Sequence, residues 1–248
     1  MSRPLTVRVV GVGMGSQHVT PEAAAALARS AYVVAAEKSA DDPLLALRRE
    51  IAAAHGLEVV AVPDPTRDRD DPADYPGAVR DWHAARAAAY AEVVAARGGD
   101  PAFLVWGDPS LYDSTIRVAR LMGPDVRVEV VAGVGAPQLL AARCGIVLHD
   151  VGRPVHVTTE RRLGEAITGG QTNVVVMLTS GPPPAGADGV PDDWCVWWGA
   201  DLGTEHESLV HGRLGDVRER IAAERERVRA AAGWVMDTYL VRAPGTTP

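Results

Sequence analysis

Short apolar runs, rich in β-branched residues, alternate with helical segments through the first half of the chain, and this alternation constrains the fold more than any other feature. The runs are continuous rather than interrupted by polar residues, which is typical of strands buried on both faces of a parallel sheet. We therefore expect a doubly wound α/β domain. The expected strands are residues 7–10, 32–36, 58–62, 102–106 and 127–131.

The segments between these runs carry helix signals. Thr20 is suited to cap a helix that Pro21 opens, because a threonine hydroxyl can accept a hydrogen bond at a helix start and proline fits the first turn. Further helices are expected over residues 43–54 and 79–97. Between them, residues 63–76 are rich in Asp, Arg and Pro and predict a long exposed loop, of a length that is often functional.

The second half of the chain differs in character, with several strand-like runs and one strong, charged helix. This mixture predicts an α+β domain rather than a second doubly wound sheet. We expect the N-terminal domain to cover residues 1–135 and the C-terminal domain residues 136–248. In the second domain the helix is expected at residues 216–232 and the strands at residues 155–159, 174–178, 195–198, 207–211 and 234–241.

Composition argues against several classes of protein. The 248 residues carry a net charge of −7 and no basic run, which argues against nucleic-acid binding as the main function. The two cysteines, Cys144 and Cys195, lack metal-type spacing and are too few for a disulfide scaffold. The N-terminus lacks the apolar stretch of a signal peptide, and no apolar run is long enough to span a bilayer. We expect a cytoplasmic enzyme or binding protein without a catalytic metal.

Three turns rich in small residues follow expected strands. They are residues 11–15 (Gly-Val-Gly-Met-Gly), residues 106–115 with a Gly-Asp-Pro sequence, and residues 131–136 with two more glycines. Ligands of doubly wound sheets bind beyond the carboxyl ends of the strands, so the turns predict a shared small-molecule site. The alternative is that each is only a tight connection to a helix. A dinucleotide fingerprint would need glycine at Ser16, which the chain lacks.

Together these turns resemble those of the tetrapyrrole methylase family, and the resemblance runs over nearly the whole chain. The Gly-Asp-Pro-x-x-Tyr signature is intact from Gly107 to Tyr112, whereas Gly135 stands where the family usually has a hydroxyl residue. The resemblance implies a two-domain fold with S-adenosylmethionine bound in the cleft between the domains. It implies these cofactor contacts: Gly11, Gly13, Gly15, Trp106, Gly107, Asp108, Leu111, Gly135, Ala136, Met177 and Ala200.

Longer stretches resemble the deacetylating precorrin-6A synthase branch of this family. They include Asp81-Trp82-His83, residues 154–163 and residues 233–240. The resemblance implies a C-methyltransferase of cobalamin biosynthesis that methylates C1 of precorrin-5 and releases acetate. It also implies that S-adenosyl-L-homocysteine is a product and that the protein forms a homodimer.

Binding such a substrate requires groups that recognise its many carboxylates. Arginine does so through paired hydrogen bonds, so Arg67 and Arg86, beside the 63–76 loop, are candidate carboxylate clamps. Lys38 and Asp113 are further substrate-binding candidates. The alternative for each arginine is a solvated surface residue.

Releasing the acetyl group requires activation of water. His83 and Asp81 are candidates for this task, with Tyr112, Asp113 or Lys38 polarising the acetyl carbonyl. The alternative for His83 is a helix-face histidine with no catalytic role.

Three other functions stay open on the sequence alone. Another precorrin or cobalt-precorrin C-methyltransferase shares the fold and the motifs. A nicotinamide oxidoreductase uses similar glycine turns, although the fingerprint fails here. A non-enzymatic corrinoid carrier would bind the tetrapyrrole without turnover.

Overall fold

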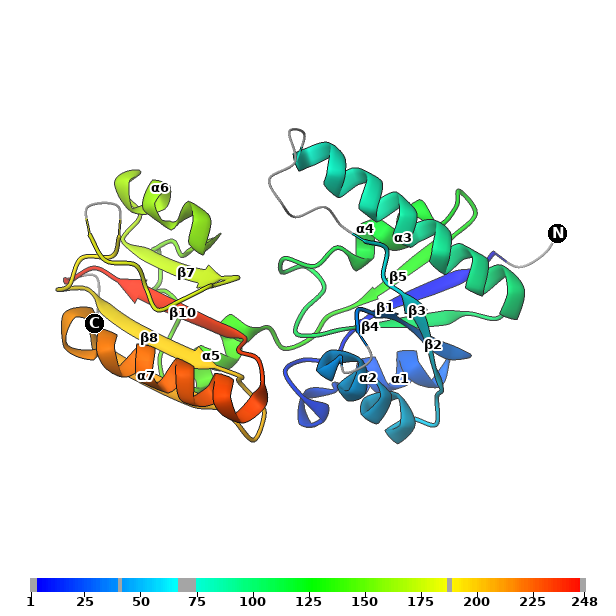
Figure 1. The fold of residues 1–248 in the computed structure, drawn as a ribbon, viewed down its shortest axis with the longest axis horizontal. Helices are drawn as coiled ribbons and strands as arrows, with labels where there is room; N and C mark the ends of the chain where they lie inside the picture. The colour runs from blue at the N-terminus through cyan, green and yellow to red at the C-terminus, as the bar shows by residue number, and fades with distance from the viewer. Residues whose placement is uncertain (1–3, 40–41, 67–74, 187–188, 246–248) are drawn as a thin grey trace. The chain divides into compact units, whose positions relative to one another are not determined.

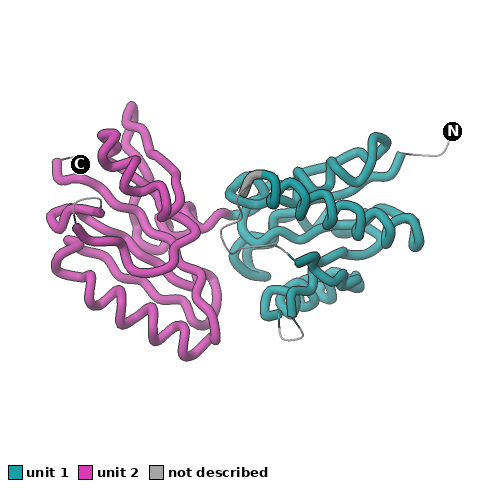
Figure 2. The backbone as a smooth tube through the Cα atoms, turned by 45° about the horizontal axis from the view of Figure 1, so that its top comes forward, with its two compact units in different colours: residues 1–134 teal, residues 135–248 magenta. Residues whose placement is uncertain are grey.

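The structure is a computed structural model that describes residues 4–39, 42–66, 75–186 and 189–245. The chain forms two compact units, residues 1–134 and residues 135–248, each built on a five-stranded sheet (Figure 2). The expected α/β and α+β classes are both confirmed. Of the helices that the structure describes, none is long and apolar enough to cross a membrane.

The sheet of the first unit is entirely parallel, which confirms the doubly wound arrangement. Its strand order is β3-β2-β4-β1-β5, so β4 is the central strand and β1 pairs with both β4 and β5. Val9 on β1, for example, lies opposite Phe103 on β4 and Val130 on β5. The strands are β1 (Thr6–Gly11), β2 (Tyr32–Glu37), β3 (Val59–Pro63), β4 (Pro101–Val105) and β5 (Arg127–Val131).

Helices cover both faces of this sheet (Figure 1). α1 (Pro21–Ala28) and α2 (Pro43–Ala54) enclose one apolar core, and α3 (Tyr75–Arg97) and α4 (Thr115–Leu121) enclose the other. The expected cap of α1 is present, because the Thr20 hydroxyl accepts a hydrogen bond from the Ala23 N–H at 3.1 Å. A short 3-10 turn, η1 (Ser16–His18), precedes it.

α3 begins earlier than expected, at Tyr75, inside the segment expected to be loop. α4 begins only at Thr115, after the Gly-Asp-Pro turn, because Tyr112 has a left-handed backbone (φ 50°) that an α-helix cannot contain. The Asp113 carboxylate then accepts a hydrogen bond from the Thr115 N–H at 2.6 Å and caps the delayed start.

The sheet of the second unit is mixed, with the order β6-β7-β10-β8-β9. β6 and β7 pair in parallel, and the other neighbours pair antiparallel. Three α-helices accompany it, where the sequence predicted one strong helix. The strands are β6 (His156–Thr159), β7 (Asn173–Met177), β8 (Cys195–Ala200), β9 (Ser208–Arg213) and β10 (Asp237–Arg242); the helices are α5 (Ala136–Cys144), α6 (Leu163–Thr168) and α7 (Leu214–Ala232), with the 3-10 turn η2 (Glu160–Arg162) before α6.

The core of this unit centres on Trp198 and Tyr239, whose side chains are fully buried. α7 contributes Leu214, Ile221 and Val228 to this core, spaced so that they share one face of the helix. Burying each such aliphatic side chain contributes about 1.5–3 kcal/mol. α7 therefore has a charged outer face and an apolar inner face. This amphipathic pattern is why the sequence predicted α7 as the one strong helix of the unit.

Candidate functional site

The carboxyl ends of β1 and β4 meet in a tight backbone bridge. The Gly13 N–H donates to the Gly107 carbonyl at 3.2 Å, and the Gly107 N–H donates to the Gly13 carbonyl at 2.8 Å. The connections after β1 and β4 leave in opposite directions along the sheet, so this is the switch point at which doubly wound folds bind ligands. Two of the predicted glycine turns therefore meet where a site is expected.

The third turn packs against the same place. A Cβ atom added to Gly11 would lie 2.6 Å from the Gly133 nitrogen, and one added to Gly133 would collide with the Gly107 carbonyl oxygen. Gly13 also has a left-handed backbone (φ 68°) that favours glycine. These glycines are thus required by backbone packing between the three turns, and this packing holds the turns in one cluster.

Asp108 links two of these turns. Its carboxylate accepts hydrogen bonds from the Ser110 N–H at 2.8 Å, the Ser110 hydroxyl at 2.5 Å and the Gly133 N–H at 2.9 Å. Partial burial raises the pKa of Asp108, but these three hydrogen bonds outweigh burial and hold the pKa below its ordinary value. Asp108 therefore stays ionised and fixes the β4 turn to the β5 turn, with room on Oδ2 for one more donor.

Trp106 follows β4 directly and carries a polar atom suited to a ligand. Its indole Nε1 is buried, and no acceptor among the described residues bonds it. A buried donor without a partner is uncommon, because its desolvation is not compensated. Leu111, in the same turn, is half-buried, whereas Tyr112 exposes 47% of its surface. The turn thus offers one unsatisfied donor and one accessible phenol.

Arg86 lies on α3 and is held by its own neighbours. Its Nε and Nη2 atoms donate to the two Asp64 carboxylate oxygens at 2.6 and 3.0 Å, and the guanidinium stacks 4.2 Å from the Trp82 ring centre. Trp82 in turn donates to the Pro65 carbonyl at 3.0 Å. This predicted clamp therefore already has a carboxylate partner. Arg67, the other predicted clamp, lies outside the described residues.

Arg48 on α2 is a residue that the sequence interpretation missed. Its Nε donates to the Leu104 carbonyl of β4 at 3.0 Å, and no carboxylate of the described residues forms an ion pair with it. Burial lowers the pKa of Arg48, opposed by the charges of Asp42 and Asp113. A half-buried arginine beside a strand carboxyl end is a candidate carboxylate ligand. Its place in an Arg-Arg-Glu run made it look like solvated helix surface.

The other polar candidates of this unit are only partly brought together. His83 is 5% exposed and shares the buried face of α3 with Ala87 and Tyr90, while Asp81 is exposed. Residues two apart on a helix do not face each other, so His83 and Asp81 do not form a pair. Asp113 lies near Arg48, and Lys38 is an exposed residue at the end of β2.

In the second unit, the predicted cofactor residues lie at one edge of the sheet. Met177 and Ala200 end β7 and β8, which run parallel to each other on either side of β10. Gly135 and Ala136 lie at the start of α5, where Gly135 is the N-terminal cap residue. The edge is therefore formed by small or flexible side chains with backbone groups beside them.

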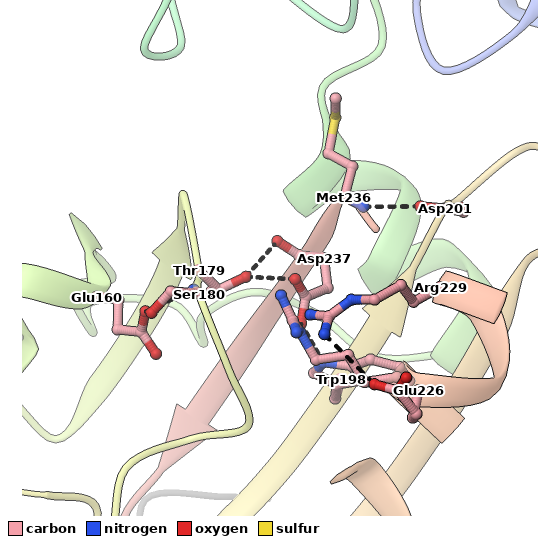
Figure 3. Close-up of polar contacts among 10 residues, drawn as sticks. Glu160, Thr179, Ser180, Trp198, Asp201, Glu226, Arg229, Met236 and Asp237 are labelled. Carbon is pink, nitrogen blue, oxygen red and sulfur yellow. Dashed lines mark hydrogen bonds and ion pairs between the residues drawn. The ribbon is translucent and has the colours of Figure 1, made fainter. Parts of the chain in front are cut away.

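A buried polar network around Asp237, at the start of β10, stabilises this edge. The Asp237 carboxylate accepts hydrogen bonds from the Thr179 hydroxyl at 2.5 Å, the Trp198 indole at 2.9 Å and the Arg225 guanidinium at 3.1 Å (Figure 3). The Asp237 side chain is fully buried. A buried ion pair with complete hydrogen bonding fixes the conformation of the strand start around it.

Backbone strain marks three positions that directly follow predicted cofactor contacts. Among the described residues, a left-handed backbone at a non-glycine residue occurs at Tyr112 (φ 50°), Leu178 (φ 55°) and Asp201 (φ 45°). Such conformations concentrate at functional sites. Each of the three directly follows a residue predicted to contact the cofactor, namely Leu111, Met177 and Ala200.

Other chemistry is not indicated in the described part of the chain. No group of three His, Cys, Asp or Glu side chains there is placed to hold a metal ion. Cys144 and Cys195 are half-buried free thiols. Burial, followed by the charge of Glu207, raises the pKa of Cys144, which disfavours its reactive thiolate.

Comparison with known proteins identifies the family. Residues 6–218 match the model of the Tetrapyrrole (Corrin/Porphyrin) Methylases, which is most of the chain. The chain belongs to the tetrapyrrole methylase family. It is therefore a methyltransferase of this family.

Individual relatives of this methylase cover nearly its whole length. A precorrin-6A synthase [deacetylating] from Sinorhizobium sp is 36% identical over 95% of this chain and 94% of that protein. The crystal structure of a cobalamin synthesis related protein (CobF) from Corynebacterium diphtheriae is 37% identical, with a TM-score of 0.81 over 97% of this chain and 99% of that one. Uroporphyrin-III C-methyltransferase from Thermus thermophilus, solved with S-adenosyl homocysteine, shares the fold at 19% identity, with a TM-score of 0.56 over 96% of this chain and 92% of that one.

Proposed function

We propose that this methylase is an S-adenosylmethionine-dependent C-methyltransferase of cobalamin biosynthesis that converts precorrin-5 to precorrin-6A. It would methylate C1 of the macrocycle and release the acetyl group as acetate. The observation that carries the proposal is the 36% identity to a deacetylating precorrin-6A synthase over 95% of the chain. A match of this extent spans both units.

The residues present fit a nucleoside-containing cofactor. The turns that contain Gly11, Gly13, Gly107 and Gly133 bring backbone groups together, and the buried Trp106 indole N–H has no acceptor among the described residues. When bound, S-adenosylmethionine supplies an electrophilic methyl group on a sulfonium. The S-adenosyl homocysteine in the Thermus thermophilus relative supports this choice. We assign cofactor contact to the eleven predicted positions, with Asp108 acting mainly as the brace between two turns.

The substrate presents several carboxylates, and arginine is the residue that binds carboxylates best. We assign this role to Arg48, whose guanidinium has no ion-pair partner among the described carboxylates, ahead of Arg86, which Asp64 already occupies. Arg67, Lys38 and Asp113 remain proposed substrate contacts. Methyl transfer is an in-line displacement, so the work of these residues is to hold C1 against the methyl group.

Release of acetate requires water to add to the acetyl carbonyl. The bond between the acetyl carbon and the macrocycle would then break, and its electron pair would stay on the macrocycle carbon, which would use it to bond the transferred methyl group. We assign to Tyr112, which exposes 47% of its surface, the donation of a hydrogen bond to the carbonyl oxygen. His83 and Asp81 remain the proposed bases, acting singly because they do not face each other.

The test is a turnover assay with two readouts. Purified protein is incubated with precorrin-5 and methyl-labelled S-adenosylmethionine, and both labelled tetrapyrrole and free acetate are measured. The proposal predicts equal amounts of the two products. A methyl gain without acetate would contradict the deacetylating assignment and favour another precorrin or cobalt-precorrin methyltransferase.

We further propose that the enzyme acts in the cytoplasm as a homodimer, on the ground of its family resemblance. Sedimentation at several concentrations tests the second point. A mass equal to one chain at all concentrations would contradict it.

A further inference from the structure

Arg242, the last residue of β10, differs from the other buried arginines of the described chain in what surrounds its charge. Arg8 forms an ion pair with Glu129 at 3.2 Å, and Arg225 forms one with Asp237 at 3.1 Å. Arg242 is 3% exposed, and no carboxylate of the described residues forms an ion pair with it. A buried charge is costly unless a counter-charge and hydrogen bonds compensate its loss of water.

The hydrogen bonds of Arg242 use neutral acceptors and leave one nitrogen without a partner. Nε donates to the Asn173 side-chain oxygen at 3.0 Å, and Nη2 donates to the carbonyls of Val147 and Leu148 at 2.9 and 3.0 Å. The Cζ atom lies 5.2 Å from the Trp197 ring centre. Within the described part of the chain, no acceptor bonds Nη1. A guanidinium carries five N–H donors, so the two on Nη1 remain for another acceptor.

A cavity adjoins this guanidinium. Its volume is about 50 Å³, which is room for a few waters or one small ion and too little for a nucleotide or a tetrapyrrole. His149, Arg153 and Thr172 are exposed and make the cavity accessible from solvent. The polar residues that line it are His149, Asp150, Arg153, Thr172, Asn173 and Arg242.

A tight turn before β6 brings a second cationic residue to the cavity. The Asp150 carbonyl accepts a hydrogen bond from the Arg153 N–H at 3.0 Å, and it lies 3.3 Å from His149 Nδ1. A carbonyl can only accept, so His149 Nδ1 carries a proton. Of the residues that line the cavity, Arg153 and Arg242 carry permanent positive charge, and Asp150 carries the one carboxylate. The lining is therefore positive overall.

We propose that this cavity binds a small tetrahedral oxyanion of the phosphate class. Arg242 offers the donors of Nη1 from the buried side, and Arg153 and the Thr172 hydroxyl offer further donors from the exposed side. Donors from three separate segments suit an ion with four oxygens better than a flat carboxylate with two. Phosphate near neutral pH also keeps an O–H group that a carboxylate such as Asp150 can accept, whereas acetate has no such donor.

The cavity lies at the opposite end of the second sheet from the predicted cofactor residues. Arg242 pairs with Asn173 at the first residue of β7, whereas Met177 ends that strand. Four residue steps of about 3.3 Å separate the two ends by about 13 Å. A bound anion would neutralise the buried guanidinium and hold the connection between α5 and β6 against β7 and β10. The proposal is therefore independent of the methyl-transfer site.

The test is isothermal titration calorimetry of the full chain with inorganic phosphate, in a phosphate-free buffer of low ionic strength. The expected result is a single site with a Kd of about 1 mM or below. Sodium acetate, titrated in the same way, should bind at least about tenfold more weakly. No binding of phosphate, or equal binding of acetate, would overturn the proposal.

Two exposed arginines provide the matched variants. Arg153→Gln removes one of the proposed ligands and should weaken phosphate binding about five- to tenfold. Arg161→Gln changes the charge of the same unit by the same amount at a residue that does not line the cavity, and it should bind as wild type does. Equal weakening by the two variants would show a general charge effect and overturn the site.

Arg242→Lys tests the buried side of the cavity. It keeps the positive charge but loses the paired donors, so phosphate binding should weaken by at least about tenfold. Unchanged phosphate affinity in a folded Arg242→Lys variant would contradict the proposal. If that variant does not fold, the comparison of Arg153→Gln with Arg161→Gln decides.

Discussion

The two units hold the carboxyl ends of their strands in place by opposite means. In the first unit the ends of β1, β4 and β5 meet backbone to backbone, and the contact depends on the absence of side chains at Gly11 and Gly133. In the second unit the ends of β7 and β8 depend on side chains that are present. There a buried network around Asp237 supports the strained residues Leu178 and Asp201.

The difference shows two physical ways to make the carboxyl ends of a sheet rigid. Glycine packing excludes water and brings backbone donors and acceptors close to a ligand at little cost in polar burial. A side-chain network fixes geometry through charge-assisted hydrogen bonds, at the risk of a buried charge if one partner is lost. The two edges should therefore fail in different ways when they are mutated.

The largest effect is expected at the side-chain network. Asp237→Ala removes the partner of the buried Arg225 and should cost about 3–5 kcal/mol of the free energy of unfolding of the second unit. Denaturant titration combined with hydrogen exchange measures this and assigns it to the unit. Glu226→Ala breaks the exposed pair with Arg229 on α7 (Figure 3) and should cost under about 1 kcal/mol. Similar losses in the two variants would contradict the role of the network.

A somewhat smaller effect is expected at the glycine contact. Gly133→Ala places a Cβ against the Gly107 carbonyl, which is backbone and cannot rotate away, and should destabilise the first unit by about 3 kcal/mol. The matched control is Gly181→Ala, because a Cβ there meets nothing within 4 Å and φ is not left-handed. If Gly133→Ala and Gly181→Ala unfold at the same denaturant concentration, the contact at Gly133 does not hold the glycine edge together.

Asp108 combines the two kinds of contact, because its side chain forms hydrogen bonds between two glycine turns. Asp108→Asn places an amide where the Gly133 N–H donates, and should cost about 2 kcal/mol. The folded pKa of Asp108 lies below its ordinary value, so its stabilisation is complete above the ordinary pKa and is lost as the pH falls through the folded pKa. The stability difference between wild type and variant, measured by denaturation, should therefore be constant near neutral pH and shrink in acid. A difference that grows in acid would contradict the assigned hydrogen bonds.

The smallest effect concerns substrate binding beside the glycine edge. Arg48→Gln should raise the KM for the tetrapyrrole roughly five- to tenfold, about 1 kcal/mol, and leave the affinity for S-adenosylhomocysteine unchanged. Arg49→Gln, at the exposed neighbour on the same helix, is the control. An equal effect of both variants would show that Arg48 acts only through general charge.

Much of the fold could be predicted because its signals are local. Continuous apolar runs mark the parallel strands, and Thr20 with Pro21 marks the start of α1. The late start of α4 could not be predicted, since a left-handed backbone is uncommon at a non-glycine residue such as Tyr112 and no local pattern indicates it. The helices α5 and α6 were weak signals because each is short and owes its stability to packing on the sheet.

The site residues, too, divide into those with a local sequence signal and those without one. The glycine turns were visible as motifs, since glycine is required wherever backbones approach closely. Arg48, Asp201 and Asp237 were not, because a charged residue in a strand or helix looks the same whether it is buried or solvated. Only the fold shows that Asp237 has every donor it needs and that Asp201 Oδ2 has none among the described residues.

The most direct measurement of the account is hydrogen exchange of the intact chain with and without S-adenosylhomocysteine. The account predicts slower exchange at residues 11–15, 106–111 and 133–136 of the glycine turns and at residues 177–178 and 200–202 of the second sheet. The exposed residues 151–153 should exchange unchanged and serve as the internal reference. Protection confined to other segments, or none at saturating ligand, would contradict the claim that these two strand edges bind the cofactor.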